Sequence, residues 1–413
     1  MSTVRLRHLA DVNPLTPAFD RLANDEELTF LPMEAVWPGE RLDISRRRVK
    51  ASVATGYTRF QNSDVLVPKI TPTFEAGRAV LIHGLHRGVG TGSTELHVLR
   101  PGPLIDPRFL LYVVNTHSFL KKGEAEMYGV AGQQRVPDAF LRDLLVDLPP
   151  LEEQRHIADF LDAETSRINA ITNAMRSEIS LLIQRRVQTI DRIWEHAKSA
   201  PRMRLGYATS LVTSGSRGWS DYVSDSGALF FRSANLRPDS IQPKLTNAVY
   251  VQIPALSATE AIRARIADGD VLVGITGANC GWVALADGAV AGGYVSQHVC
   301  LVRPDEHRIS GEWLTYLIAS PSVQDRLMGS QYGGTKTQLS LPDIRDLRVP
   351  VLPITEQKKL SGEITRQVSR IDNMRSLRSR QLDLLAERRL ALITAAVTGQ
   401  IDVSTASGRG IEE

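Results

Sequence analysis

Leu148-Pro149-Pro150-Leu151-Glu152-Glu153-Gln154 marks the end of one globular segment and the start of a long helix. The two prolines stop the preceding extended segment, and the acids follow where a helix dipole favours negative charge. The pattern returns about 203 positions later, where Pro353 precedes Glu356-Gln357. Each copy runs into a long stretch of helical spacing, so the sequence predicts a domain followed by a helix, twice.

The duplication extends through both globular segments. Asp64-Val65-Leu66-Val67 corresponds to Asp270-Val271-Leu272-Val273, and Leu141-Arg142-Asp143-Leu144 corresponds to Ile344-Arg345-Asp346-Leu347. A repeat of this length is a duplicated domain and not a solenoid unit. Two related domains favour a pseudo-two-fold molecule, and duplex DNA is a ligand with matching symmetry.

Composition limits the class of protein. A chain of 413 residues allows two to four domains. Its net charge of +3 permits nucleic-acid binding without requiring it. Cys280 and Cys300 are too few for a disulfide framework and for most structural zinc sites. The N-terminus lacks an apolar signal segment, and no apolar run could span a bilayer, so we expect a soluble, cytoplasmic protein without a membrane partner.

Both globular segments have a mixed α/β (α+β) pattern, with short apolar runs between Gly- and Pro-bearing turns and then an apolar helix. The first copy predicts strands at 65–70, 80–82 and 96–99 and a helix at 107–116. The second copy predicts strands at 271–275, 283–285 and 299–302 and a helix at 311–319.

Two long helices are predicted after these domains, at about 152–198 and 355–398, from apolar residues at steps of three and four. Gly399 stands where a C-cap glycine would end the second helix. We expect an antiparallel pair of coiled-coil type, with ordinary core packing as the alternative. The predicted organisation is a first domain at 1–147, a central helix at 148–199, a second domain at 200–350, a C-terminal helix at 351–400 and a flexible tail at 401–413.

Three stretches together resemble the specificity subunits of type I restriction–modification systems. They are the opening Leu148–Gln154 motif, the segment Leu385-Ala386-Glu387-Arg388-Arg389-Leu390 that continues to Val403, and Ser214-Gly215-Ser216-Arg217-Gly218-Trp219 followed by Gly227-Ala228-Leu229-Phe230-Phe231-Arg232. The resemblance covers essentially the whole chain in the right order. One departure is Leu352-Pro353-Ile354, which replaces the usual double proline in the second copy.

The resemblance implies a non-catalytic subunit that reads double-stranded DNA. Each domain would recognise one half of an asymmetric, bipartite target, and the helices would set the gap between the halves. The same helices would dock two copies of an adenine-specific methyltransferase subunit, and a translocating endonuclease subunit would join them. The alternative is a coiled-coil DNA-binding scaffold or regulator outside restriction–modification, which has no evident need of two readers.

Candidate DNA-binding residues are long polar side chains on loops, since sequence is read at the groove edges of the bases. Gln133 and Gln338 are favoured because they occupy comparable loops in the two copies, whereas Trp219 is equally well explained as core packing. The first domain contributes Gln133, Gln134 and Arg135, with Lys69, Arg46, Arg47 and Arg48 on phosphates, and the second contributes Arg217, Trp219, Arg232, Asn235, Thr335, Lys336 and Gln338.

Catalytic and metal sites are not predicted, and neither is a cofactor. Asp147-Leu148-Pro149-Pro150-Leu151 lacks the spacing and the aromatic residue of an amino-methyltransferase loop. Asp343, Glu356 and Lys358 have the residue types of a metal-dependent nuclease, but Glu356 and Lys358 would point to different faces of a helix. His83 and His86 have no neighbouring Cys or carboxylate to complete a metal site.

Overall fold

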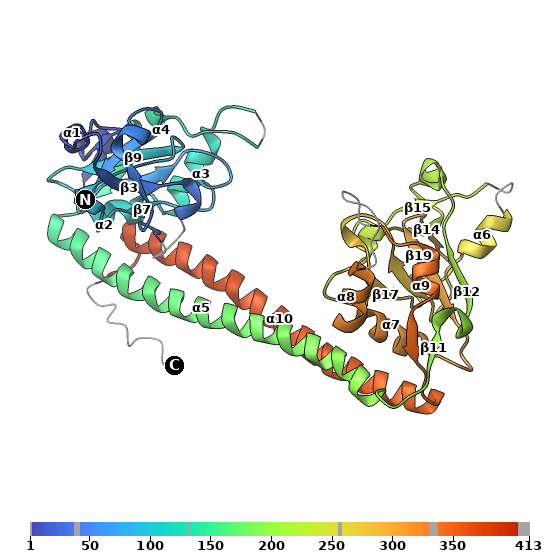
Figure 1. Cartoon of the computed structure of the whole chain (residues 1–413). Helices are drawn as coiled ribbons and strands as arrows, with labels where there is room; N and C mark the ends of the chain where they lie inside the picture. Colours follow the sequence, from blue (N-terminus) through green and yellow to red (C-terminus); the bar gives the residue numbers. More distant parts are fainter. Residues whose placement is uncertain (1, 37–41, 131, 255–257, 330–337, 404–413) are drawn as a thin grey trace. The chain divides into compact units, whose positions relative to one another are not determined.

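The computed structural model describes residues 2–36, 42–130, 132–254, 258–329 and 338–403. Contacts divide the chain into two compact units, residues 1–177 with 379–413 (unit 1) and residues 178–378 (unit 2). Each unit contains one globular domain and the adjoining parts of the long helices α5 (Leu151–His196) and α10 (Ile354–Val397) (Figure 1).

The globular domain of unit 1 has three sheets. A ribbon of β1 and β10 pairs the two ends of the domain, a four-stranded antiparallel sheet has the order β2-β9-β6-β7, and a mixed sheet has the order β4-β3-β8-β5 with β3 and β8 parallel. The strands are β1 Ser2–Arg5, β2 Ala10–Val12, β3 Glu27–Leu31, β4 Arg47–Val49, β5 Thr58–Gln61, β6 Val65–Pro68, β7 Val80–Leu81, β8 Val89–Gly92, β9 Leu96–Pro101 and β10 Leu145–Leu148. The helices are α1 Pro17–Asp20, α2 Pro107–Val113, α3 His117–Ala125 and α4 Asp138–Asp143.

The globular domain of unit 2 repeats this plan. A ribbon of β11 and β20 pairs its ends, an antiparallel sheet has the order β12-β19-β16-β17, and a second sheet has the order β13-β15-β14-β18 with β14 and β18 parallel. The strands are β11 Arg202–Arg204, β12 Thr209–Ser214, β13 Val223–Ser224, β14 Ala228–Phe231, β15 Tyr250–Val251, β16 Val271–Gly274, β17 Val283–Leu285, β18 Tyr294–Val295, β19 Val299–Pro304 and β20 Arg348–Pro350. The helices are α6 Ala258–Ala264, α7 Gly311–Ala319, α8 Pro321–Gly329 and α9 Leu341–Arg345.

The predicted elements are present in both copies. β6, β7 and β9 and their counterparts β16, β17 and β19 form the antiparallel sheets, and α2 and α7 follow them at nearly the predicted bounds. The fold class is confirmed as mixed α/β domains in internal repeat.

The two long helices run antiparallel within each unit. In unit 2, Arg186 of α5 pairs with Asp372 of α10 at 3.1 Å, while Glu178 pairs with Arg378 at 2.8 Å, so the partner number rises as the α5 number falls. Apolar residues of both helices also join the domain cores, Ile157 and Ile393 in unit 1 and Ile193 and Ile364 in unit 2. The predicted antiparallel pair is therefore confirmed.

The apolar stripes of the two helices are only partly buried. Ile171 and Val187 of α5 and Met374, Leu377 and Leu384 of α10 are exposed. Two helices alone bury a single seam between them, so apolar residues beside that seam face solvent.

The end of α10 is as expected. Gly399 has a φ of 70°, a left-handed conformation that glycine adopts without strain, and the amides of Gly399 and Gln400 bond back to the last turn. Most of the segment predicted as a flexible tail, residues 404–413, lies outside the described residues. In the described ranges, no helix is both long enough and apolar enough to cross a membrane.

Candidate nucleic-acid interface

The candidate loop of unit 1 is fixed at its base by Arg135. Arg135 forms β-bridges with Ile70 and Tyr128, and its guanidinium pairs with both carboxylate oxygens of Glu95 at 2.8 and 2.9 Å. Arg135 holds the pKa of Glu95 below its usual value. The loop projects from the domain (Figure 1), with Gln133 exposed and Gln134 half-buried. Arg135 thus has a structural partner, whereas Gln133 presents its amide to solvent.

Lys69 lies beside this ion pair. Its backbone amide donates to the Glu95 carbonyl at 2.8 Å, and its Nζ donates to the Thr94 carbonyl at 2.9 Å. Burial lowers the pKa of Lys69. The structure therefore brings together Lys69 and Arg135, two of the predicted cations, at the end of β6.

The basic triplet lies on a different sheet, at the outer strand β4 of the mixed sheet. Arg46 pairs with Glu34 at 2.8 Å, Arg47 donates to Thr29 Oγ1 at 3.2 Å, and the Arg48 guanidinium lies 5.6 Å from the centre of the Phe30 ring. All three side chains are exposed, so they remain accessible to a phosphate despite these contacts.

Two predicted residues of unit 2 are corrected by their burial. Trp219 is 2% exposed, packs edge-on against Tyr294 and belongs to the apolar cluster that contains Phe230 and Val295. Asn235 is also 2% exposed, and its amide bonds to the Arg232 amide and the Lys244 carbonyl. Both residues therefore serve the fold, and their burial does not support the predicted DNA contacts.

The other candidates of unit 2 differ in accessibility. Arg217 is exposed, whereas Arg232 is half-buried and its buried Nε has no hydrogen-bond partner among the described residues. Gln338 is exposed and forms a β-bridge with Thr276. Thr335 and Lys336 lie outside the described residues.

The Glu-Gln motif at each helix start has a structural role that the sequence did not reveal. Gln154 is fully buried; its Oε1 accepts from the Asp106 amide, and its Nε2 donates to the carbonyls of Leu104 and Pro149. Gln357 makes the same three bonds in unit 2, with the Ser310 amide and the carbonyls of Arg308 and Leu352. Each glutamine therefore locks a long helix to its own domain.

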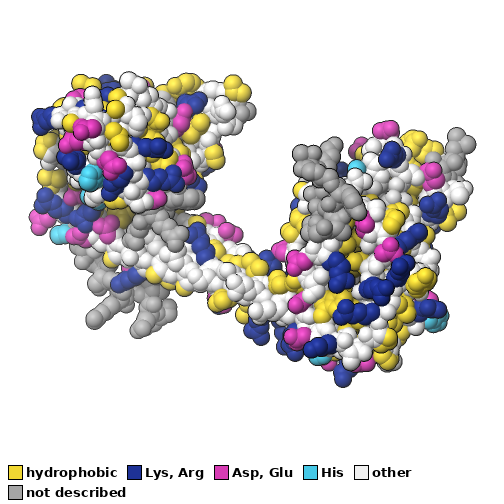
Figure 2. All heavy atoms as spheres, viewed as in Figure 1, with side chains coloured by type: hydrophobic (Ala, Val, Ile, Leu, Met, Phe, Trp, Pro, Cys, Tyr) yellow, Lys and Arg dark blue, Asp and Glu magenta, His cyan; other side chains and the backbone are white. Residues whose placement is uncertain are grey.

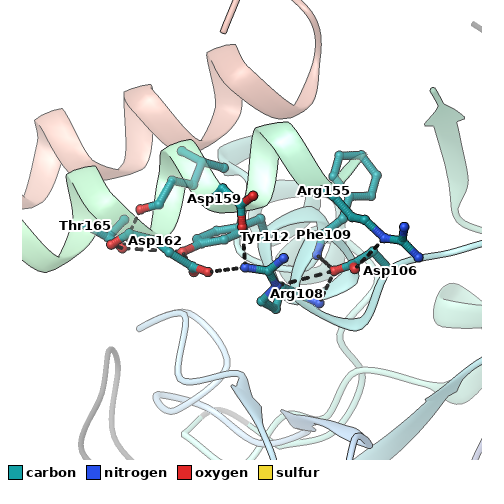
Figure 3. Close-up of polar contacts among 9 residues, drawn as sticks. Asp106, Arg108, Phe109, Tyr112, Arg155, Asp159, Asp162 and Thr165 are labelled. Atoms are coloured by element: carbon teal, nitrogen blue, oxygen red, sulfur yellow. Dashed lines mark hydrogen bonds and ion pairs between the residues drawn. The ribbon is translucent and has the colours of Figure 1, made fainter. Parts of the chain in front are cut away.

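Side chains of α2 reinforce that junction in unit 1 (Figure 3). Arg108 Nη1 donates to Asp159 at 2.6 Å and to Asp162 at 2.9 Å, and the Tyr112 hydroxyl donates to Asp162 at 2.6 Å. Burial and the neighbouring Asp162 raise the pKa of Tyr112, so its hydroxyl stays a donor. These contacts fix the direction in which α5 leaves the domain.

Unit 2 builds the same junction with an acid in place of Arg108 and with hydroxyl groups in place of the two aspartates. Glu312 of α7 accepts hydrogen bonds from Ser361 and Thr365 of α10, at 2.8 and 2.5 Å. The Tyr316 hydroxyl lies 2.9 Å from Thr365 Oγ1, and burial raises the pKa of Tyr316 to about 12. The helix–domain junction is thus common to both copies, although its residue types differ.

The acids of the nuclease-like stretch have local structural roles. Asp343 accepts from the Ser340 amide and hydroxyl and caps α9, while Glu356 lies in the first turn of α10. Over the described ranges, no group of three His, Cys, Asp or Glu side chains is placed to hold a metal ion. On the face shown in Figure 2, Lys and Arg side chains of each unit lie among Asp and Glu side chains.

Comparison with known proteins finds a family of DNA specificity domains that matches part of the chain. Residues 55–181 match the family described as "Type I restriction modification DNA specificity domain". The chain is similar to the specificity subunits of the type I restriction enzymes EcoAI and EcoEI from Escherichia coli, with 39% identity over 156 residues and 36% over 158. Each match covers 37% of this chain and 26% of the relative, so the chain matches about a quarter of the length of these relatives.

A solved structure has a similar fold over nearly the whole chain. It comes from work titled "Structural basis underlying complex assembly and conformational transition of the type I R-M system". The TM-score is 0.75 at 16% sequence identity, with 97% of this chain and 98% of that chain covered. The resemblance predicted from the sequence is therefore confirmed.

Proposed function

Because the chain carries the DNA specificity domain of type I restriction–modification systems, we propose that it is the non-catalytic reader of a bipartite, asymmetric DNA target. The observation that carries the proposal is the repeat: each unit contains the same pair of four-stranded sheets, while the exposed polar residues on them differ. Two domains of one fold with different surface chemistry suit two half-sites of different sequence.

The domains at 1–147 and 200–350 are proposed to read one half-site each, and the helices at 148–199 and 351–400 to set the gap. α5 has 46 residues and is therefore about 70 Å long. The hydrogen bonds of Gln154 at the start of α5 support a role in setting the gap, because a helix that sets a fixed gap must leave its domain in a fixed direction.

The helices also offer a surface for protein partners. In unit 2, Leu181 of α5 and Leu377 of α10 are 63% and 64% exposed. In unit 1, Ile171 and Leu384 are exposed on the same two helices. Exposed apolar side chains on both units are consistent with docking of two adenine methyltransferase subunits, which would supply the catalysis, and an endonuclease subunit would join that complex. We expect the protein to bind DNA in the cytoplasm.

The test is genome-wide sequencing of N6-methyladenine in the host, with the gene, without it and with the gene restored. We expect deletion to abolish methylation of one bipartite motif with a fixed gap, and restoration to return it. An unchanged methylation pattern in a host that expresses the neighbouring methyltransferase would contradict the proposal.

A domain exchange tests the division of labour. Replacing residues 200–350 with those of a relative should change one half of the motif and leave the other half and the gap intact. A change in both halves would refute independent readers.

A further inference from the structure

The backbone hydrogen bonds define which residues of the two units are equivalent. The Lys69 amide donates to the Glu95 carbonyl in unit 1, and the Ile275 amide donates to the His298 carbonyl in unit 2. Ile70 forms a β-bridge with Arg135, and Thr276 forms one with Gln338. Glu95 is therefore equivalent to His298, and Arg135 is equivalent to Gln338.

Elsewhere on the same strands, the two units keep identical chemistry. Arg100 of β9 pairs with both oxygens of the buried Asp64 at 2.8 and 2.9 Å. Arg303 of β19 pairs with both oxygens of the buried Asp270 at 2.9 and 2.8 Å. This ion pair, at the far end of each strand, is a requirement of the fold that both copies retain.

At the other end of these strands, next to the starts of β9 and β19, the two units have different residue types. Unit 1 has the bidentate Glu95–Arg135 ion pair. Unit 2 has no charged pair at the equivalent positions: His298 Nδ1 lies 2.6 Å from Thr276 Oγ1, and its Nε2 lies 3.1 Å from Gln297 Nε2. Because both versions support the same backbone pairing, the fold does not dictate the residue types at this end.

Among the described residues of unit 2, the hydrogen bonds around His298 leave one acceptor without a partner. When Gln297 Nε2 donates to His298 Nε2, the ring proton is on Nδ1 and is donated to Thr276 Oγ1. Gln297 Oε1 and the Gln338 amide then make no hydrogen bond with other described residues. Half-buried Gln297 and exposed Gln338 thus carry amide groups that can bond base edges, and neutral groups gain little from phosphates.

We propose that Gln297 and His298, together with Gln338, read base edges of the second half-site, and that Glu95 positions Arg135 to read the first. This inference rests on the proposed function. Glu95 accepts from Nε and Nη2 of Arg135, and the Gln133 carbonyl accepts from Nη1 at 3.3 Å. The guanidinium keeps further N–H donors on Nη1 and Nη2, which suit O6 and N7 of a guanine. The first half-site is therefore expected to hold a guanine at the position where the second half-site lacks one.

The test transplants the ion pair of unit 1 into unit 2 through the double substitution His298→Glu with Gln338→Arg. The matched control is His307→Glu, an exposed position beyond the opposite end of β19, which is about 20 Å long. Each chain is co-expressed with its methyltransferase subunits in a host without other adenine methylation, and the methylated motif is sequenced.

We expect the double variant to change the second half-site toward guanine and to methylate the original target at least tenfold less, with the first half-site and the gap retained. His307→Glu should keep the original motif. An unchanged motif in the double variant would overturn the proposal.

A complete loss of methylation is resolved by selection of a randomised second half-site with the purified complex. Recovery of a new sequence supports the proposal, whereas recovery of the original sequence, or failure of the complex to assemble, overturns it. A wild-type chain that yields no bipartite motif would refute the proposed function itself, before any variant is compared.

Discussion

Replacing Gln154 with leucine removes three hydrogen bonds from the junction between α5 and its domain. The side chain is fully buried and bonds the Asp106 amide at 2.8 Å and the carbonyls of Pro149 and Leu104 at 2.9 and 3.1 Å. Leucine nearly preserves the volume but leaves three backbone groups without a partner. A buried group left unsatisfied costs roughly 1–3 kcal/mol, and those nearer the surface can recover water, so we expect a loss of about 3 kcal/mol.

Amide hydrogen exchange measures the lost stability of the junction separately in each unit. A loss of about 3 kcal/mol corresponds to roughly a hundredfold faster exchange of the Asp106 amide if exchange follows opening of the junction. Gln357→Leu should produce the same change at Ser310 in unit 2, because Gln357 bonds that amide at 2.9 Å. Each variant should leave the other unit unchanged.

Glu153→Ala is the matched control, since Glu153 is exposed beside Gln154 and its loss should cost less than about 0.5 kcal/mol. An effect of Gln154→Leu no larger than that of this control would refute the view that the glutamine locks the helix to the domain.

Three further predictions concern pH and spacing. Burial lowers the pKa of His97 from 6.5 to about 4, so the free energy of unfolding of unit 1 should fall by about 3 kcal/mol as the pH falls from 6.5 to 4. His97→Cys, which installs the residue of the equivalent position Cys300, should abolish this pH dependence of stability in urea denaturation. An equal pH dependence in the variant would contradict the assignment. Arg135→Gln should raise the pKa of Glu95 toward its ordinary value of 4.5, and in the wild type the stabilising effect of the pair should be present above about that pH and disappear as the pH falls through the lowered pKa. Carbon-13 NMR titration measures the pKa in both chains, and identical titration curves would exclude the pairing. Inserting seven residues near Arg185, with a matching insertion in α10, lengthens the helices by about 10 Å and should widen the methylated motif's gap by about three base pairs; an unchanged gap would place the spacing elsewhere, for instance in DNA bending.

Local patterns predicted the repeated elements well. The long helices begin and end within about two residues of the expected bounds, and β6 and β16 start at the predicted Val65 and Val271. These elements depend on helical periodicity, on short apolar runs and on capping residues, which are visible within a short window of sequence.

Other elements depend on contacts between distant parts of the chain. β3 pairs in parallel with β8, about 60 residues away, and the equivalent strands β14 and β18 are only four and two residues long. Short strands with remote partners have no distinctive local pattern, so the sequence did not predict the mixed sheets. The burial of Asn235 was not evident for the same reason, whereas core packing of Trp219 was one of the two stated alternatives.

Comparison of the two loops in sequence associated Gln338 with Gln133. The β-bridges of the structure instead make Gln338 equivalent to Arg135. The loop ahead of these residues differs between the copies, so only the backbone pairing fixes the correspondence. That correspondence identifies Glu95 and His298, which sequence analysis missed, as the residues next to each candidate reader.

The sequence by itself determined the duplication, the two long helices and the resemblance to DNA specificity subunits, because periodicity and repeated motifs are local properties of the chain. Only the tertiary structure decided which polar side chains are accessible and which are engaged. Gln154 and Gln357 were prominent in the sequence and are buried structural locks, whereas His298 was inconspicuous and is exposed beside Gln338. The physical reason is that exposure and hydrogen-bond partners arise from packing between segments far apart in the chain.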